Sequence, residues 1–143
     1  MSRHVFLLSP AYCGGRRAQS LFDPDAEFAL ARRLRGPEGI TLGEAFSFMS
    51  GLYFRGKLAY ARAFGTAMPG SGGLVIAPGH GLLDADHRVT KSDLESMAAV
   101  PVDLEVDGYR GPLERDARKL ARRGAEFDAV VLLGSIEIGR AHV

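Results

Sequence analysis

The most informative segment of this chain is Leu74-Val-Ile-Ala-Pro-Gly-His-Gly-Leu-Leu-Asp-Ala-Asp86. Its apolar start, Leu74 to Ala77, is typical of a buried β-strand, and Pro78-Gly79 ends the strand. One histidine and two aspartates follow in the next few positions. In open α/β sheets, ligands bind just beyond the carboxyl ends of buried strands. The stretch therefore predicts a strand with a polar site beside it.

Two more apolar runs predict strands. His4 to Ser9 opens the chain and stops at Pro10, and Asp128 to Leu133 lies near its end. Helical signals separate the three runs, and strands that alternate with helices form parallel sheets with right-handed crossovers. The expected fold is therefore α/β, a three-layer sandwich in which helices flank a small parallel sheet.

The helices are predicted from their end signals. Asp23-Pro24 resembles an N-cap followed by a first-turn proline, and Gly36-Pro37 would end that helix. Two pairs match the capping box, in which a hydroxyl and a carboxylate satisfy each other's free amides. These pairs are Thr41 with Glu44 and Ser92 with Glu95, and each is predicted to start a helix. Two further helical segments are predicted over 54–64 and over Pro112 to Arg123, and a loop is predicted over Ala11 to Arg17.

Length and composition set the broad class of the protein. The chain has 143 residues, 46% of them hydrophobic and 24% charged, which is typical of a single soluble domain. A net charge of +1 carries no global nucleic-acid signal. The lone cysteine excludes an internal disulfide, and the first apolar run is too short for a signal peptide or a membrane span. We therefore expect a cytoplasmic protein that does not enter the membrane.

The last seven residues, Glu137-Ile-Gly-Arg-Ala-His-Val143, resemble the in-frame translation of a common sequencing adapter. We expect residues 1–136 to form one α/β domain, the N-terminal part of a longer protein truncated at its C-terminus. Residues 137–143 would then be a non-native tail, which is excluded from fold reasoning. The alternative is a genuine short C-terminus.

Polar residues follow all three predicted strands, so a ligand site is expected where the strands end. The first strand is followed by Ser9, Tyr12, Cys13, Arg16 and Arg17; the second by His80, Gly81, Asp84 and Asp86; and the third by Ser135. Because carboxyl ends of parallel strands share one edge, these side chains are predicted to converge.

Each of these residues has a functional and a structural interpretation. His80 can act as a general acid or base together with Asp84, or it can cap its own turn. Asp84 and Asp86 can orient a ligand or stabilise a turn. Gly14-Gly15-Arg16-Arg17 can bind an anion or form a surface turn. Cys13 can be a nucleophile or a small packed side chain.

A further basic pair precedes the second predicted strand, Leu74 to Ala77. In Tyr53-Phe-Arg-Gly-Lys57, Arg55 and Lys57 can contact phosphate, or they can extend from a helix face toward solvent. The histidines and acids do not match the spacing of a known metal site, so the sequence predicts neither a metal nor another cofactor.

Three segments together resemble an uncharacterised bacterial and phage domain family. They are Cys13-Gly-Gly-Arg-Arg17, Leu52-Tyr-Phe-Arg-Gly-Lys57 and Ala77-Pro-Gly-His-Gly-Leu-Leu-Asp-Ala-Asp86, and the third is the most specific. That family has Ser-Ala-Lys-His-Gly-Leu-Leu-x-Pro-Asp at the third segment. More distantly, the segment is similar to a loop in the uracil-DNA-glycosylase-like domain of archaeosine synthase and related tRNA-guanine transglycosylases.

The resemblance implies a nucleotide, nucleoside or modified nucleobase as ligand, with His80 and Asp84 as reacting or orienting groups and the arginines on phosphate. Two departures limit it. Pro10-Ala11-Tyr12 stands where glycosylases have a water-activating aspartate, and Gly79 replaces the family's lysine. Glycosylase activity is therefore not implied. The two functional hypotheses are an enzyme that processes such a ligand and a non-catalytic module that binds a nucleotide or nucleic acid.

Overall fold

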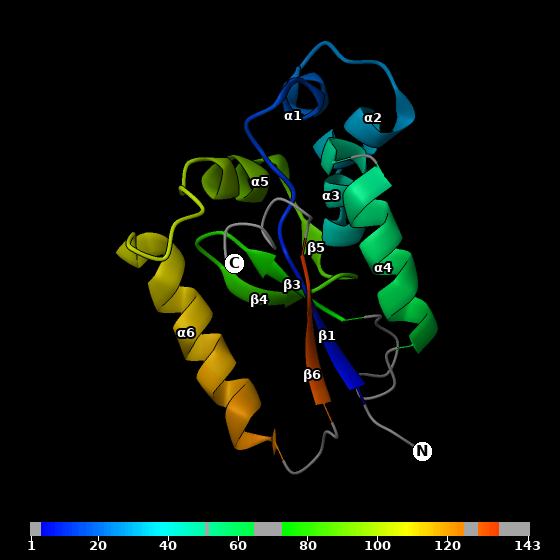
Figure 1. The fold of residues 1–143 in the computed structure, drawn as a ribbon. Coiled ribbons are helices and arrows are strands. Elements are labelled where there is room, and N and C mark those ends of the chain that lie inside the picture. The colour runs from blue at the N-terminus through cyan, green and yellow to red at the C-terminus, as the bar shows by residue number, and fades with distance from the viewer. Residues whose placement is uncertain (1–3, 51, 65–72, 125–128, 135–143) are drawn as a thin grey trace.

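The computed structural model describes residues 4–50, 52–64, 73–124 and 129–134 (Figure 1). In chain order the elements are β1 (His4–Leu8), α1 (Arg16–Phe22), α2 (Ala29–Arg35), β2 (Ile40–Thr41), α3 (Leu42–Ser50), α4 (Leu52–Phe64), β3 (Leu74–Ala77), β4 (Gly81–Asp84), β5 (Arg88–Val89), α5 (Lys91–Ala98), α6 (Asp107–Arg122) and β6 (Ala129–Leu133).

The main sheet has the strand order β4-β3-β1-β6. β1 pairs in parallel with β3, where Leu7 lies opposite Leu74, and with β6, where Phe6 lies opposite Val131. These are the three predicted strands, and the α/β class is confirmed. β4 was not predicted; it runs antiparallel to β3, while β2 and β5 form a separate two-stranded sheet.

Helices cover the sheet from two sides, with α3 and α4 on one side and α6 on the other (Figure 1). The core lies mainly between the sheet and the N-terminal helices. There Phe46 and Phe54 meet edge to face with ring centroids 5.4 Å apart, and Leu8 and Leu21 are buried with them. This burial of apolar surface is the main contribution to stability. On the other side, the Leu82 amide donates to Asp116 of α6 at 2.9 Å.

The first helix was not predicted, and the second begins later than the sequence predicted. α1 begins at Arg16, inside the predicted loop, and α2 begins only at Ala29. The Asp23 carboxylate accepts a hydrogen bond from the Asp25 amide at 2.9 Å, so it stabilises a turn rather than a helix start. The predicted helix start at Asp23-Pro24 was therefore wrong, although the predicted end at Gly36 was right.

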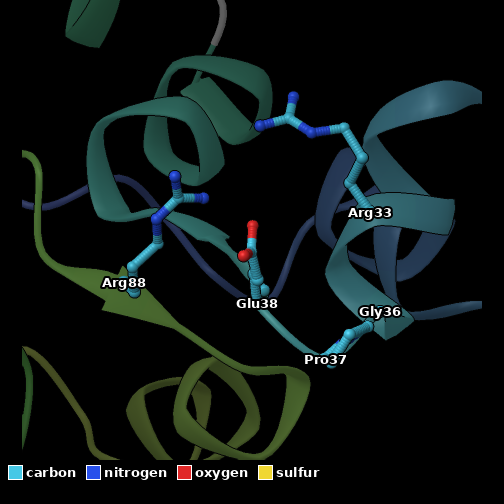
Figure 2. A pocket seen from close by; sticks show the side chains of 6 residues that line it. Arg33, Gly36, Pro37, Glu38 and Arg88 are labelled. Atoms are coloured by element: carbon cyan, nitrogen blue, oxygen red, sulfur yellow. The ribbon is translucent and has the colours of Figure 1, made fainter.

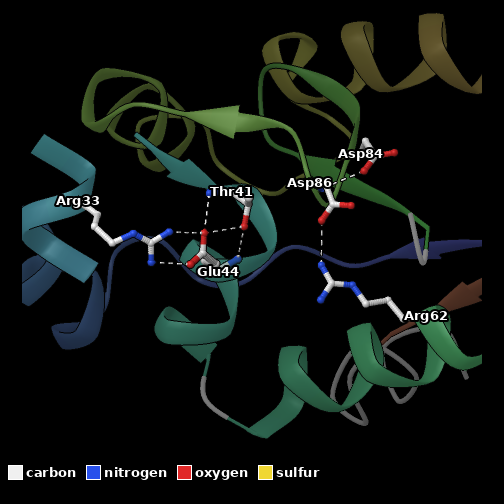
Figure 3. Close-up of polar contacts among 6 residues, drawn as sticks. All are labelled: Arg33, Thr41, Glu44, Arg62, Asp84 and Asp86. Atoms are coloured by element: carbon white, nitrogen blue, oxygen red, sulfur yellow. Dashed lines mark hydrogen bonds and ion pairs between the residues drawn. The ribbon is translucent and has the colours of Figure 1, made fainter. Parts of the chain in front are cut away.

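The two predicted capping boxes had different outcomes. At the start of α3, Thr41 Oγ1 accepts from the Glu44 amide and Glu44 Oε1 accepts from the Thr41 amide, both at 3.1 Å (Figure 3). The box predicted at Ser92 lies instead at Thr90 and Asp93, two residues earlier.

The last helix is longer than predicted. α6 starts five residues before Pro112, which therefore lies within the helix. A proline there has no backbone N–H to donate, so the helix has one hydrogen bond fewer at this position.

Candidate functional site

The carboxyl ends of β1, β3 and β6 lie at one edge of the sheet, as predicted, because the three strands are parallel. The Ser9 amide donates to the Leu133 carbonyl at 3.0 Å, which ties the end of β1 to the end of β6. Ser9 is buried at 3% exposure. Ser135, predicted to join this edge, lies outside the described residues.

Lys57 reaches this edge from α4. Its ammonium donates to the Ser9 carbonyl at 3.3 Å and lies 5.7 Å from the centre of the Phe54 ring. Burial lowers the pKa of the Lys57 ammonium, because an apolar environment disfavours the charged form. The structure therefore brings together two predicted site residues that are far apart in the sequence.

A cleft of about 160 Å³ lies beside the end of β1. One wall is the loop from Ala11 to Gly14, and Pro78 contributes from the end of β3. The opposite wall comes from the end of α5 and the segment after it: Met97, Ala98, Val100, Pro101 and Val102. Its lining is mainly apolar, which is typical of ligand pockets.

Cys13 lines this cleft with a buried side chain. Its thiol donates to the Ala11 carbonyl at an Sγ–O distance of 3.6 Å. Burial raises the pKa of the Cys13 thiol from 9.0 to about 11, because the thiolate would be poorly solvated. At neutral pH the group is therefore a neutral thiol, which suits a packed side chain and not a nucleophile.

Tyr12 is the aromatic residue of the cleft, and it is 77% exposed. Its ring lies close to the backbone of the two glycines that follow. A Cβ placed on Gly14 would lie 2.8 Å from Tyr12 Oη, and one on Gly15 would lie 3.5 Å from the ring. The glycines therefore leave room for the ring at the mouth of the cleft.

His80 lies in the tight turn between β3 and β4. Gly79 and Gly81 on either side have φ of 81° and 83°, a backbone region that favours glycine. The His80 amide donates to the Ala77 carbonyl at 2.8 Å, and Nε2 lies 3.4 Å from the Ser96 Oγ of α5. Ser96 was not singled out from the sequence.

Asp84 and Asp86 do not join His80, contrary to the prediction. Asp84 pairs with Leu74, the first residue of β3, because β4 reverses the chain. The length of β4 therefore separates Asp84 from the turn, a distance of about 10 Å. The Asp84 carboxylate accepts from the Asp86 amide at 2.8 Å, and Asp86 pairs with Arg62 at 3.0 Å (Figure 3). Asp84 therefore stabilises the turn that follows β4, and Asp86 links this turn to α4.

The predicted arginines do not gather at the strand ends. Arg17 donates to the Phe48 carbonyl at 2.5 Å and lies over the Phe48 ring, 5.1 Å from its centre. Arg16 on α1 and Arg55 on α4 are exposed, and neither has an ion pair among the described residues. Only Lys57, of the four predicted cations, contacts the end of a strand.

A second hollow, of about 380 Å³, lies between α2 and β5 and was not predicted (Figure 2). Arg33, Glu38 and Arg88 line it. The Arg33 guanidinium is held by both carboxylate oxygens of Glu44 at 2.8 and 3.1 Å (Figure 3). Charges of both signs meet there, so the hollow has no strong preference for an anion.

The described residues contain no cluster of three or more histidine, cysteine or acidic side chains that could hold a metal ion. None of the described helices has the length and apolar character needed to span a bilayer. Comparisons of this chain with models of protein families, with curated proteins and with solved structures find no match.

Proposed function

We propose that the protein binds a nucleobase-containing small molecule, a nucleotide, nucleoside or modified base, at the carboxyl edge of its sheet. The observation that carries the proposal is the apolar cleft beside the exposed Tyr12 ring. An aromatic ring at the mouth of a narrow apolar cleft suits a planar heterocycle, because every base has a face that stacks.

The size of the cleft limits the size of the ligand. Pockets for drug-sized ligands measure roughly 300–1,000 Å³, whereas this cleft measures about 160 Å³. It therefore suits one ring system, and the sugar and phosphate of a nucleotide would lie outside it. Of the predicted cations, Lys57 at the end of β1 is the one at this edge for a phosphate.

Processing of the ligand is the second candidate function, and the His80–Ser96 contact is the observation that favours it. A hydroxyl and an imidazole 3.4 Å apart are close to the geometry of a nucleophile and its base, which is often looser without substrate. Neither side chain lines the cleft, however. We therefore propose binding as the main function and processing as the alternative.

The test is a binding panel followed by a search for turnover. Isothermal titration calorimetry with the common nucleobases, nucleosides and nucleoside monophosphates measures affinity. Tyr12→Ala should weaken binding by about tenfold or more, since stacking on an aromatic side chain contributes roughly 1–3 kcal/mol per base. Tyr12→Phe keeps the ring and should bind like the wild type.

A matched pair of variants locates the ligand. Ala98→Leu narrows the cleft and should reduce binding, whereas Ala99→Leu changes the exposed neighbour that does not line it. Equal effects of both variants, or no binding of any compound in the panel, would contradict the proposal. Product formation that is lost in His80→Gln while affinity is kept would establish processing instead of binding alone.

A further inference from the structure

One region of the surface is unusually apolar. Among the described residues, ten large hydrophobic side chains are exposed, and six of them lie on α4 and β6. We define the α4–β6 face by these six together with Gly56: Leu52, Tyr53, Tyr60, Phe64, Val130 and Leu132. Phe6 pairs with Val131 and contacts Tyr60, so the α4 side chains lie on one face of β6 and Val130 and Leu132 on the other, and together they flank the strand's open edge. Exposed apolar surface on both faces of an open edge is typical of an interaction site.

β6 is the last strand of the main sheet among the described residues. Its sequence from Ala129 to Leu133 contains no charge and no proline, the features that usually protect an edge strand from pairing. Val130 and Leu132 are 48% and 56% exposed, although a strand of a parallel sheet is normally covered on both faces.

A groove of about 460 Å³ runs between α4 and β6 on the other face of the strand. Gly56, Tyr60, Val131 and Leu133 are among its lining residues. Lys57 is the charged residue that lines it, and its ammonium donates to the Ser9 carbonyl. The groove therefore offers apolar surface and little that would select a charged peptide.

We propose that the α4–β6 face binds a second copy of this chain, with the two β6 strands paired antiparallel about a twofold axis at Val131. This symmetry places Leu132 beside Val130 of the second copy, so that apolar side chains meet at both positions. The two sheets then join into one, and each open strand edge satisfies the other's free backbone groups.

The helices fit the same symmetry. The Tyr60 ring meets Phe6 edge to face with centroids 5.5 Å apart, and Phe6 pairs with Val131, so Tyr60 lies level with the axis. Gly56 and Phe64 lie four residues to either side of Tyr60, so Gly56 faces Phe64 of the second copy. A Cβ on Gly56 would meet no atom within 4 Å, which leaves space for that ring.

The exposed rings supply a substantial part of the surface that such a dimer needs. Tyr53, Tyr60 and Phe64 are 66%, 51% and 56% exposed. At about 200 Å² per ring they present roughly 350 Å². Further area comes from Leu52, the β6 side chains and the strand backbone. A stable interface buries roughly 800 Å² per partner.

The test is sedimentation velocity of the whole chain from micromolar to millimolar concentration, with matched charge variants. We expect a concentration-dependent dimer that Leu132→Lys weakens by about tenfold or more. Leu104→Lys, at 57% exposure outside this face, should dimerise like the wild type. Gly56→Phe fills the open space without touching the core, and should also prevent dimerisation.

Circular dichroism establishes that each variant is folded, and if Leu132→Lys is not, Gly56→Phe decides the result. A monomer at every concentration would overturn the proposal. So would a dimer that both folded variants leave unchanged, because the two copies would then associate through another surface.

Discussion

Replacing Glu44 by glutamine tests the polar cluster that joins α2 to α3. Both Glu44 oxygens accept from Arg33, and Oε1 also accepts from the amide and hydroxyl of Thr41 at 3.1 Å. Glutamine has nearly the same shape and can still complete a capping box. Glu44→Gln therefore removes mainly the negative charge, and its effect on stability measures what that charge contributes.

The magnitude follows from the pKa of Glu44. Hydrogen bonding to Arg33 is the largest cause that lowers this pKa, from 4.5 to about 2. At about 1.4 kcal/mol per unit, the full shift would correspond to roughly 3 kcal/mol. The two side chains are 35% and 50% exposed, however. Solvent screening reduces the expected contribution to about 1 kcal/mol.

The lowered pKa of Glu44 also determines how its contribution to stability changes with pH. Because the folded pKa of Glu44 lies below the unfolded one, its stabilisation is present above 4.5 and is lost as pH falls toward 2. Urea unfolding should therefore show wild type and Glu44→Gln differing most near neutral pH and converging in acid. Glu38→Gln, an exposed neighbour, is the control. A difference that stays constant from about pH 6 to pH 3 would contradict this prediction, since it could not come from ionisation of Glu44.

Three further predictions concern the turn after β3, the α6 contact and the cleft. Gly81→Ala should lower the unfolding free energy by about 2 kcal/mol or more, because φ at Gly81 is 83° and a Cβ would collide with the Asp116 carboxylate. Gly111→Ala is the control, because a Cβ on Gly111 would meet no atom within 4 Å, and equal urea midpoints for the two variants would contradict the prediction. Asp116→Ala removes the acceptor of the Leu82 amide, and thermal unfolding should show a loss of about 1–2 kcal/mol; an unchanged midpoint would mean that water replaces the contact. Cys13, with a thiol pKa of about 11, should react with iodoacetamide far more slowly in the native protein than in denaturant, and equal rates in a mass-spectrometric assay would show that the thiol is accessible.

The three parallel strands were predictable because each is a continuous apolar run that turn-forming residues bound. β4 was not, because Gly81-Leu-Leu-Asp84 has adjacent leucines and no alternation of apolar and polar residues. It forms because the left-handed glycines on either side of His80 reverse the chain onto β3. α1 was missed for a similar reason: only Ala18 and Leu21 of its seven residues are buried.

The candidate site was predictable only as far as local sequence determines it. The shared edge of the strands follows from their parallel order, which places Ser9 and His80 just after the ends of β1 and β3, whereas Asp84 lies at the far end of β4. Contacts between distant segments were not available to sequence reasoning. Lys57 meets Ser9 across 48 residues and His80 meets Ser96 across 16, and both contacts depend on how a helix packs.

The reversal of the chain at His80 also bears on the choice between binding and processing. An imidazole that transfers protons is usually oriented by a second group, and Asp84, the acid predicted for that role, lies at the other end of β4. Of the groups that line the cleft, the Cys13 thiol is neutral, and the Tyr12 hydroxyl belongs to an exposed ring. The cleft is therefore better suited to holding a planar ring than to transforming it. We expect ligands in the binding panel to be recovered unchanged, and His80→Gln to bind them as tightly as the wild type.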